Sequence, residues 1–312
     1  MKSECIISIL LITTLLASCS TVPSETAAAT QITTTEAVDT APVETASETE
    51  EVIPETTEAG PIVVETGFTT SEPEIEEDNG TSKRVTFFRD DNVIKSKVYL
   101  PEGEGPFKTV IITGGLYASL GFYSSKAEAF CDSGYAVIEM RPANNVMPSP
   151  YTEPEFIGDF VYDQMLDIFA LMDSLTYFSE FDTSNLYLFG HSMGGLATVY
   201  AGVLRQDAIK GIILAEPSFQ YPETMTFENG QKLPTDFYTF LADCTAPVLI
   251  ITGTGERPDL NDFPHFYDNA INTLVNSQLV TVEGADHVMS GDYGIQMVEQ
   301  AVTVMEIWEQ QA

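Results

Sequence analysis

The sequence feature that most restricts the fold is a glycine-rich turn between a predicted strand and a predicted helix. The apolar run 185–189 predicts a buried strand, the turn at 190–195 reads G-H-S-M-G-G, and 196–201 favours a helix. The glycines at both ends of the turn leave out Cβ atoms where the strand and helix backbones approach each other. Such a turn lifts its serine above the edge of the sheet. We therefore predict an α/β fold that presents Ser192 as a nucleophile.

The turn resembles the nucleophile elbow of the α/β-hydrolase superfamily, whose motif G-x-S-x-G follows a central strand. The resemblance covers about 85–310 and implies a mostly parallel central sheet with helices on both faces and a small cap insertion. It also implies an oxyanion hole made of two backbone amides. One is the amide of Met193, which opens the helix after the elbow. The other is the amide of Leu116, because Gly114-Gly115-Leu116 follows strand 109–113 where the superfamily often has His-Gly-x.

Hydrophobic patterns predict the other elements of this fold. Alternating residues at 85–89 and 93–101 predict an N-terminal hairpin, and continuous apolar runs predict strands covered on both faces. The expected later strands are 109–113, 136–140, 185–189, 209–215, 247–252 and 279–282, and the expected helices are 125–132, 156–175, 196–201 and 295–308. The aromatic segment 216–245 falls where many α/β-hydrolases insert a cap. We expect this cap, with Phe237 and Tyr238, to line the pocket for the acyl or alcohol part of a substrate.

A serine hydroxyl needs a general base at neutral pH, and the base needs an acid that orients it. The chain has three histidines. His191 lies inside the elbow and is expected to point away from its apex, and His265 begins a predicted helix. His287 follows the last predicted strand in G-x-x-H, where the superfamily places its base. The order Ser192, acid, His287 is also that of the superfamily.

The acid is expected in the loop after the penultimate strand, which offers Glu256, Asp259 and Asp262. The superfamily's acid usually lies about three residues beyond the glycine that ends this strand, and counting from Gly253 gives Glu256. Pro258 stiffens the loop, so Asp259 is the alternative acid. Acidic residues in such a loop are usually exposed to solvent and have no catalytic role, which is the alternative for each of them.

The resemblance implies a serine hydrolase that cleaves carboxylic esters, similar in organisation to single-domain esterases and acyl-peptidase-like hydrolases. In that mechanism, His287 takes the proton of Ser192, the amides of Met193 and Leu116 hold the oxyanion, and water then releases the acyl group. A non-catalytic binding protein on the same fold is an alternative, because a fold does not fix a function. The complete set of serine, acid and histidine argues against that alternative.

A nicotinamide-dependent reductase is a further alternative, because 113–115 and Gly121 faintly resemble the dinucleotide loop of short-chain dehydrogenases. Ala118 and Leu120, however, stand where that loop needs glycines for close approach to a pyrophosphate. The sequence also has no H-E-x-x-H motif and no Cys/His cluster with metal-ligand spacing. We therefore expect neither a metal nor an organic cofactor.

The first residues resemble a bacterial lipoprotein signal peptide. Lys2 precedes the apolar run 6–17, which is too short to span a bilayer, and 16–19 reads L-A-S-C, similar to a lipobox. We expect residues 1–18 to be removed and Cys19 to carry a lipid. That lipid would anchor the protein to a membrane at the cell surface or in the periplasm. A plain signal peptide with a chance cysteine is the alternative.

The segment 19–82 is rich in Thr, Glu, Ala and Pro and lacks Lys and Arg, a composition that cannot bury a core. We predict a disordered acidic tether followed by one hydrolase domain at 83–312. The net charge of −34 argues against nucleic acid as a partner. The expected partners are a small-molecule ester and, through the lipid, a membrane, with the domain a monomer. Cys131 and Cys244 are expected to be buried free thiols, with a disulfide as the alternative.

Overall fold

The computed structural model describes residues 67–143, 157–255 and 263–311. Within them, the chain forms a nine-stranded sheet of order β1-β2-β3-β5-β4-β6-β7-β8-β9. The strands are β1 (Glu74–Asp78), β2 (Ser82–Arg89), β3 (Asn92–Tyr99), β4 (Phe107–Thr113), β5 (Ala136–Arg141), β6 (Phe181–His191), β7 (Gly211–Ala215), β8 (Val248–Gly253) and β9 (Ser277–Val282). The pairs β1–β2, β2–β3 and β3–β5 are antiparallel, and all later pairs are parallel. The predicted hairpin and mostly parallel sheet are confirmed.

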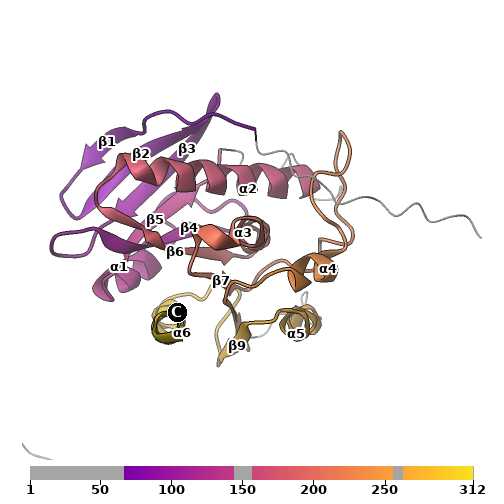
Figure 1. The fold of residues 1–312 in the computed structure, drawn as a ribbon. Coiled ribbons are helices and arrows are strands. Elements are labelled where there is room, and N and C mark those ends of the chain that lie inside the picture. The colour runs from indigo at the N-terminus through magenta and orange to yellow at the C-terminus, as the bar shows by residue number, and fades with distance from the viewer. Residues whose placement is uncertain (1–66, 144–156, 256–262, 312) are drawn as a thin grey trace, which may run out of the picture. The chain divides into compact units, whose positions relative to one another are not determined.

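Helices cover both faces of the sheet, so the domain has two apolar cores (Figure 1). One face carries α1 (Ser124–Asp132) and α6 (Asp292–Gln311); the other carries α2 (Ile157–Ser174), α3 (Met193–Leu204), α4 (Phe237–Ala242) and α5 (Phe263–Thr273). Successive side chains of a strand enter opposite cores, as Ile111 does relative to Val110 and Ile112. Central strands therefore read as continuous apolar runs, which is why the sequence revealed them.

The ordered domain begins before residue 83, so the predicted boundary is wrong. Residues 67–82 were expected to be part of the tether, but they are described here, and β1 pairs with β2. Every residue of β1 is exposed, and its acidic side chains meet basic ones: Glu76 pairs with Lys95, and Glu77 lies 3.4 Å from Arg84. An edge strand needs a hydrogen-bonded neighbour but no buried face, and charges are common there. The other residues of the predicted tether lie outside the described part of the chain.

The segment 216–245 lies between β7 and β8, as predicted, but its central phenylalanine is a core residue. Phe237 is 1 % exposed, and its ring centroid lies 5.8 Å from that of Tyr200 and 4.9 Å from that of Phe219. Tyr238 is only half-buried. This corrects the expectation that Phe237 lines a substrate pocket, because its ring fills the space between α3 and its own segment.

We expect Phe237→Ala to lower the free energy of unfolding by about 3–5 kcal/mol, because it removes a buried ring and leaves a cavity. Tyr238→Ala should cost less stability and should instead change the preference for acyl chain length, if its ring contacts the remote part of a substrate. Urea denaturation and rates on a series of esters measure the two effects. An unchanged denaturation midpoint in Phe237→Ala would contradict its place in the core.

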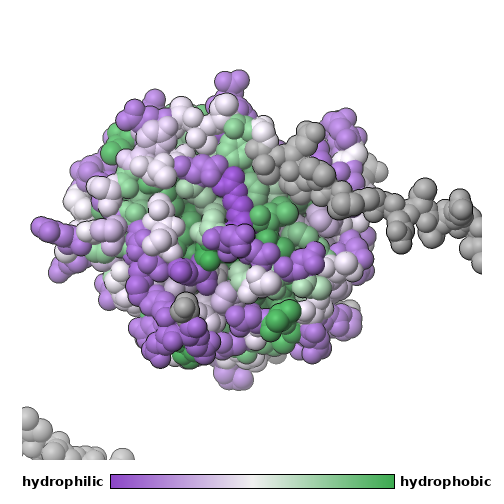
Figure 2. Space-filling model, in the orientation of Figure 1, coloured by the Kyte–Doolittle hydropathy of each residue, from purple (hydrophilic) through white to green (hydrophobic). Residues whose placement is uncertain are grey.

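The face drawn in Figure 2 is mostly hydrophilic, with hydrophobic patches between the hydrophilic residues. No helix in the described ranges combines the length and the apolar character needed to cross a membrane. Cys131 and Cys244 are both free thiols; Cys244 is buried, as expected, whereas Cys131 is only partly buried.

Candidate active site

The sheet topology brings the loops after β4 and β6 together. β4 lies between β5 and β6, and the chain leaves β4 toward β5 but leaves β6 toward β7. Because these connections run in opposite directions, a crevice opens at the carboxyl ends of β4 and β6, where α/β proteins bind ligands. Gly114 and Gly115 follow β4, and Ser192 follows β6. The predicted nucleophile therefore lies next to the loop that carries Leu116.

Ser192 occupies a strained turn. Its φ of +55° and ψ of −123° belong to a region that residues other than glycine rarely adopt. Neighbouring backbone holds it there: its N–H donates to the Ala215 carbonyl, and its carbonyl accepts from the Ser218 N–H, both at 3.0 Å. A Cβ on Gly194 would lie 2.2 Å from the Gly114 carbonyl oxygen. Only glycine there lets α3 pack against the loop after β4.

His287 lies in the loop after β9 and contacts the serine. Its Nε2 is 3.0 Å from Oγ of Ser192, a hydrogen-bond distance across which a base can take the hydroxyl proton. His265 is exposed on α5 and lies 3.2 Å from the side chain of Asn269. Of the three histidines, the sequence reasoning selected the one that the structure places against Ser192.

Two backbone amides beside the serine are available as donors. Neither Met193 nor Leu116 donates its N–H to any acceptor among the described residues. Met193 opens α3, and the first N–H groups of a helix have no acceptor within it. The loop that carries Leu116 packs on the serine, because a Cβ on Gly115 would lie 3.1 Å from Cβ of Ser192. Available amides beside a nucleophile are what an oxyanion hole requires.

The predicted acid Glu256 and its alternatives Asp259 and Asp262 lie outside the described residues, so the acid stays a prediction. The stem of their loop does run beside the turn before His287. The Gly255 N–H donates to the Ala285 carbonyl at 2.8 Å. Gly255, the last described residue before this loop, is therefore hydrogen-bonded two residues before His287.

Asp286 is an acid next to the histidine that the sequence reasoning did not consider. Its two carboxylate oxygens accept from the N–H and the hydroxyl of Ser290, at 3.0 and 3.1 Å. The carboxylate thus stabilises the turn 286–290. We do not expect Asp286 to be the acid that orients His287.

Tyr123 is a site residue that the sequence reasoning missed, and His191 is one to which it assigned no role. The Tyr123 hydroxyl accepts from the Gly115 N–H at 2.9 Å and lies 2.7 Å from Nδ1 of His191. Nε2 of His191 lies 2.7 Å from the backbone carbonyl oxygen of His287. These partners are 68 and 96 residues apart, so no local spacing could have revealed them.

A buried glutamate of β5 holds the loop that carries Tyr123. Oε1 of Glu139 accepts from the Gly121 N–H at 2.9 Å and from the Tyr123 N–H at 3.0 Å, and Oε2 accepts from the Tyr99 hydroxyl at 3.1 Å. Burial raises the pKa of Glu139, and these hydrogen bonds act against the rise. The Glu139 carboxylate therefore holds the loop after β4 at Gly121 and Tyr123.

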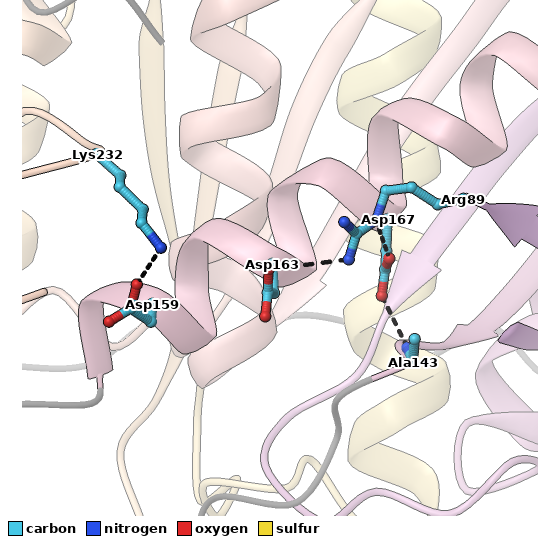
Figure 3. Close-up of polar contacts among 6 residues, drawn as sticks. All are labelled: Arg89, Ala143, Asp159, Asp163, Asp167 and Lys232. Atoms are coloured by element: carbon cyan, nitrogen blue, oxygen red, sulfur yellow. Dashed lines mark hydrogen bonds and ion pairs between the residues drawn. The ribbon is translucent and has the colours of Figure 1, made fainter. Parts of the chain in front are cut away.

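A second polar network holds Ala143, just after β5 (Figure 3). Asp167 of α2 is fully buried and accepts from Nε of Arg89 and from the Ala143 N–H, each at 2.7 Å. Burial raises the pKa of Asp167, against the opposing effect of the arginine. Farther along α2, Asp159 pairs with Lys232 at 2.5 Å and so ties the segment 216–245 to the helix.

A cavity of about 190 Å³ lies beside the serine. Besides Ser192 and His287, its lining includes Leu116, Tyr117 and Phe122 of the loop after β4. Among the described residues that line it, none is Asp, Glu, Lys or Arg. Across the parts of the chain that the structure describes, no group of three or more His, Cys, Asp or Glu is placed to hold a metal ion.

Comparisons with known proteins agree with this geometry. A family described as "Serine aminopeptidase, S33" matches residues 159–250. No curated protein matches the chain in sequence. Est1E from Butyrivibrio proteoclasticus superposes with a TM-score of 0.54 at 18 % identity, over 73 % of this chain and 99 % of its own.

Two further solved structures are similar over comparable lengths. Proline iminopeptidase from Mycobacterium smegmatis superposes with a TM-score of 0.56 at 13 % identity, over 73 % of this chain and 99 % of its own. Dienelactone hydrolase from Anabaena variabilis superposes with a TM-score of 0.52 at 16 % identity, over 75 % of this chain and 97 % of its own. The chain therefore has the fold that its elbow predicted, the α/β-hydrolase fold.

Proposed function

We propose that this α/β-hydrolase fold carries a serine hydrolase that cleaves carboxylic esters through an acyl-enzyme. The observation that carries the proposal is the strained Ser192, whose hydroxyl lies 3.0 Å from Nε2 of His287. The matching family and the solved hydrolases of the same fold support a serine hydrolase. The ester substrate is inferred from the uncharged described residues that line the cavity beside Ser192.

The reaction follows from the positions of these groups. His287 takes the Ser192 proton at Nε2 while Oγ attacks the ester carbonyl, and the oxyanion accepts from the amides of Met193 and Leu116. His287 then gives its proton to the departing alcohol, which leaves an acyl group on Ser192. Water, activated by the same imidazole, releases the acid. A carboxylate on Glu256, or alternatively Asp259, would accept a hydrogen bond from the Nδ1–H of His287 and stabilise the imidazolium.

The site favours an uncharged ester over a peptide with a free N-terminus. An aminopeptidase must hold a protonated α-amino group, and among the described residues that line the cavity beside Ser192 none has an acidic side chain. Anionic substrates are disfavoured by a chain of net charge −34. A short acyl or small alcohol group without charge fits both observations.

A substrate panel tests this proposal. We expect hydrolysis of p-nitrophenyl acetate and butyrate and much slower cleavage of alanine and proline p-nitroanilides. Activity on the anilides alone would replace the ester hydrolase with a peptidase on the same site. Ester hydrolysis that persists unchanged in Ser192→Ala would point to a binding protein with adventitious activity.

We also propose a lipid anchor at Cys19, which rests on the lipobox-like sequence at 16–19. Cys19→Ala should move the protein from the membrane fraction to the soluble fraction without changing ester hydrolysis, because the lipid is far along the chain from Ser192. Fractionation of the producing cells with an activity assay on each fraction measures this. Membrane retention equal to that of the wild type would exclude the anchor.

A further inference from the structure

Three hydrogen bonds join the loop after β4 to the loop after β9. The Gly115 N–H donates to the hydroxyl of Tyr123, this hydroxyl meets Nδ1 of His191, and Nε2 of His191 meets the His287 carbonyl oxygen, at 2.9, 2.7 and 2.7 Å. The tyrosine is 1 % exposed and the histidine 4 %. Buried polar groups need hydrogen-bond partners, so the loss of any bond in this series would leave a buried donor or acceptor without a partner from it.

The chemistry of the two ends fixes where the protons lie. A carbonyl oxygen can only accept, so Nε2 of His191 carries a proton and donates to His287. A neutral imidazole has one N–H, so Nδ1 accepts from the Tyr123 hydroxyl, which itself accepts from Gly115. Burial raises the pKa of Tyr123, which keeps the phenol protonated for this role. Each donor in the series therefore has an acceptor.

The two ends of the series lie next to the groups that the proposed reaction uses. Gly115 immediately precedes the Leu116 amide, and the carbonyl at the other end belongs to His287 itself. His191 packs closely against both neighbours. Its ring centroid lies 4.9 Å from that of His287, and a Cβ on Gly115 would lie 3.0 Å from Nδ1 of His191. A shift of the His191 ring would move the amide and the base together.

We propose that Tyr123 and His191 form a hydrogen-bond relay, in which each proton has a fixed position, and that this relay positions the Leu116 amide and His287 around Ser192. Both are positioning residues, because they act through the amide and the base. The inference rests on the proposed function, since it assigns them a part in that reaction. Misplacing reacting groups by about 1 Å can cost about a hundredfold in rate.

Tyr123→Phe tests the relay, because it removes only the hydroxyl. The matched control is Tyr187→Phe in β6, where another buried hydroxyl donates one hydrogen bond, to Glu309 at 3.0 Å. We expect Tyr123→Phe to lower kcat about ten- to a hundredfold per titrated active site, with KM changed less than about twofold. Tyr187→Phe should keep the wild-type kcat even if its melting temperature falls as much.

Nitrogen NMR of ¹⁵N-histidine protein gives a second readout, and the chain has only three histidines to assign. His191, identified with His191→Gln and His265→Gln, should carry its proton on Nε2, because Nε2 faces a carbonyl oxygen. In Tyr123→Phe the two tautomers should become mixed, because Nδ1 has lost its donor.

Two results would overturn the relay: an unchanged kcat per active site in Tyr123→Phe, or a wild-type His191 protonated on Nδ1. An equal loss of kcat in Tyr187→Phe would also overturn it, because general destabilisation would then explain the loss in Tyr123→Phe. A wild-type protein without any hydrolase activity would overturn the proposed function instead, and the histidine spectra would then decide the hydrogen-bond order on their own.

Discussion

Ser192→Ala and His287→Ala are each expected to lower kcat for a short-chain ester by about 10⁵- to 10⁶-fold, with the melting temperature close to that of the wild type. The serine variant removes the attacking oxygen but keeps a Cβ in the same strained turn. The histidine variant removes the group that lies 3.0 Å from that oxygen. Because the two residues act as a unit, the double variant should be no slower than either single one.

His265→Ala is the matched control for the histidine variant. This histidine is exposed on α5, and its ring nitrogen meets only the side chain of Asn269 among the hydrogen bonds of the described residues. Its removal should leave kcat unchanged. A loss of less than about tenfold in His287→Ala would remove it from the reaction and leave Ser192 without an identified base.

Glu256→Gln is expected to lower kcat by about two to four orders of magnitude with little change in KM, and Asp259→Asn should do much less. An amide cannot stabilise the imidazolium that forms when His287 takes the serine proton, so the loss falls on the transition state. Steady-state kinetics of both variants on one ester measure the ranking.

Gly255, which immediately precedes Glu256 in the chain, donates its N–H to the Ala285 carbonyl, two residues before His287. Asp286→Asn is the control, since its carboxylate is bound to Ser290. The reverse ranking would move the acid to Asp259 and leave the rest of the mechanism unchanged. Wild-type activity in both Glu256→Gln and Asp259→Asn would exclude these two residues as the acid and leave Asp262 as the carboxylate of this loop.

The parts of the fold that the sequence predicted are those with a local physical signature. The elbow depends on glycines whose Cβ atoms would collide with neighbouring backbone, as at Gly194, and this requirement is visible in the motif itself. Strands such as β4 are covered on both faces, so they read as unbroken apolar runs. His287 was selected because it follows the last predicted strand, which corresponds to β9.

The features that the sequence did not reveal depend on contacts between distant segments. β1 has no buried side chain and is held by the hydrogen bonds and charges of its neighbour. Phe237 looked like a cap residue because its segment is aromatic, and only the tertiary packing against Tyr200 makes it core. The bond between Tyr123 and His191 has no sequence counterpart, because two ordinary residues acquire it through the meeting of two loops.

The most direct test of the central claim is to identify the residue that becomes acylated. The wild-type protein is treated with a fluorophosphonate, which traps serine nucleophiles, and is analysed by intact mass and peptide mapping, with Ser192→Ala alongside. We predict one adduct per chain, on the peptide that contains Ser192, together with complete loss of ester hydrolysis, and no adduct in the variant. An adduct on another residue, or hydrolysis that continues after Ser192 is fully labelled, would contradict the account.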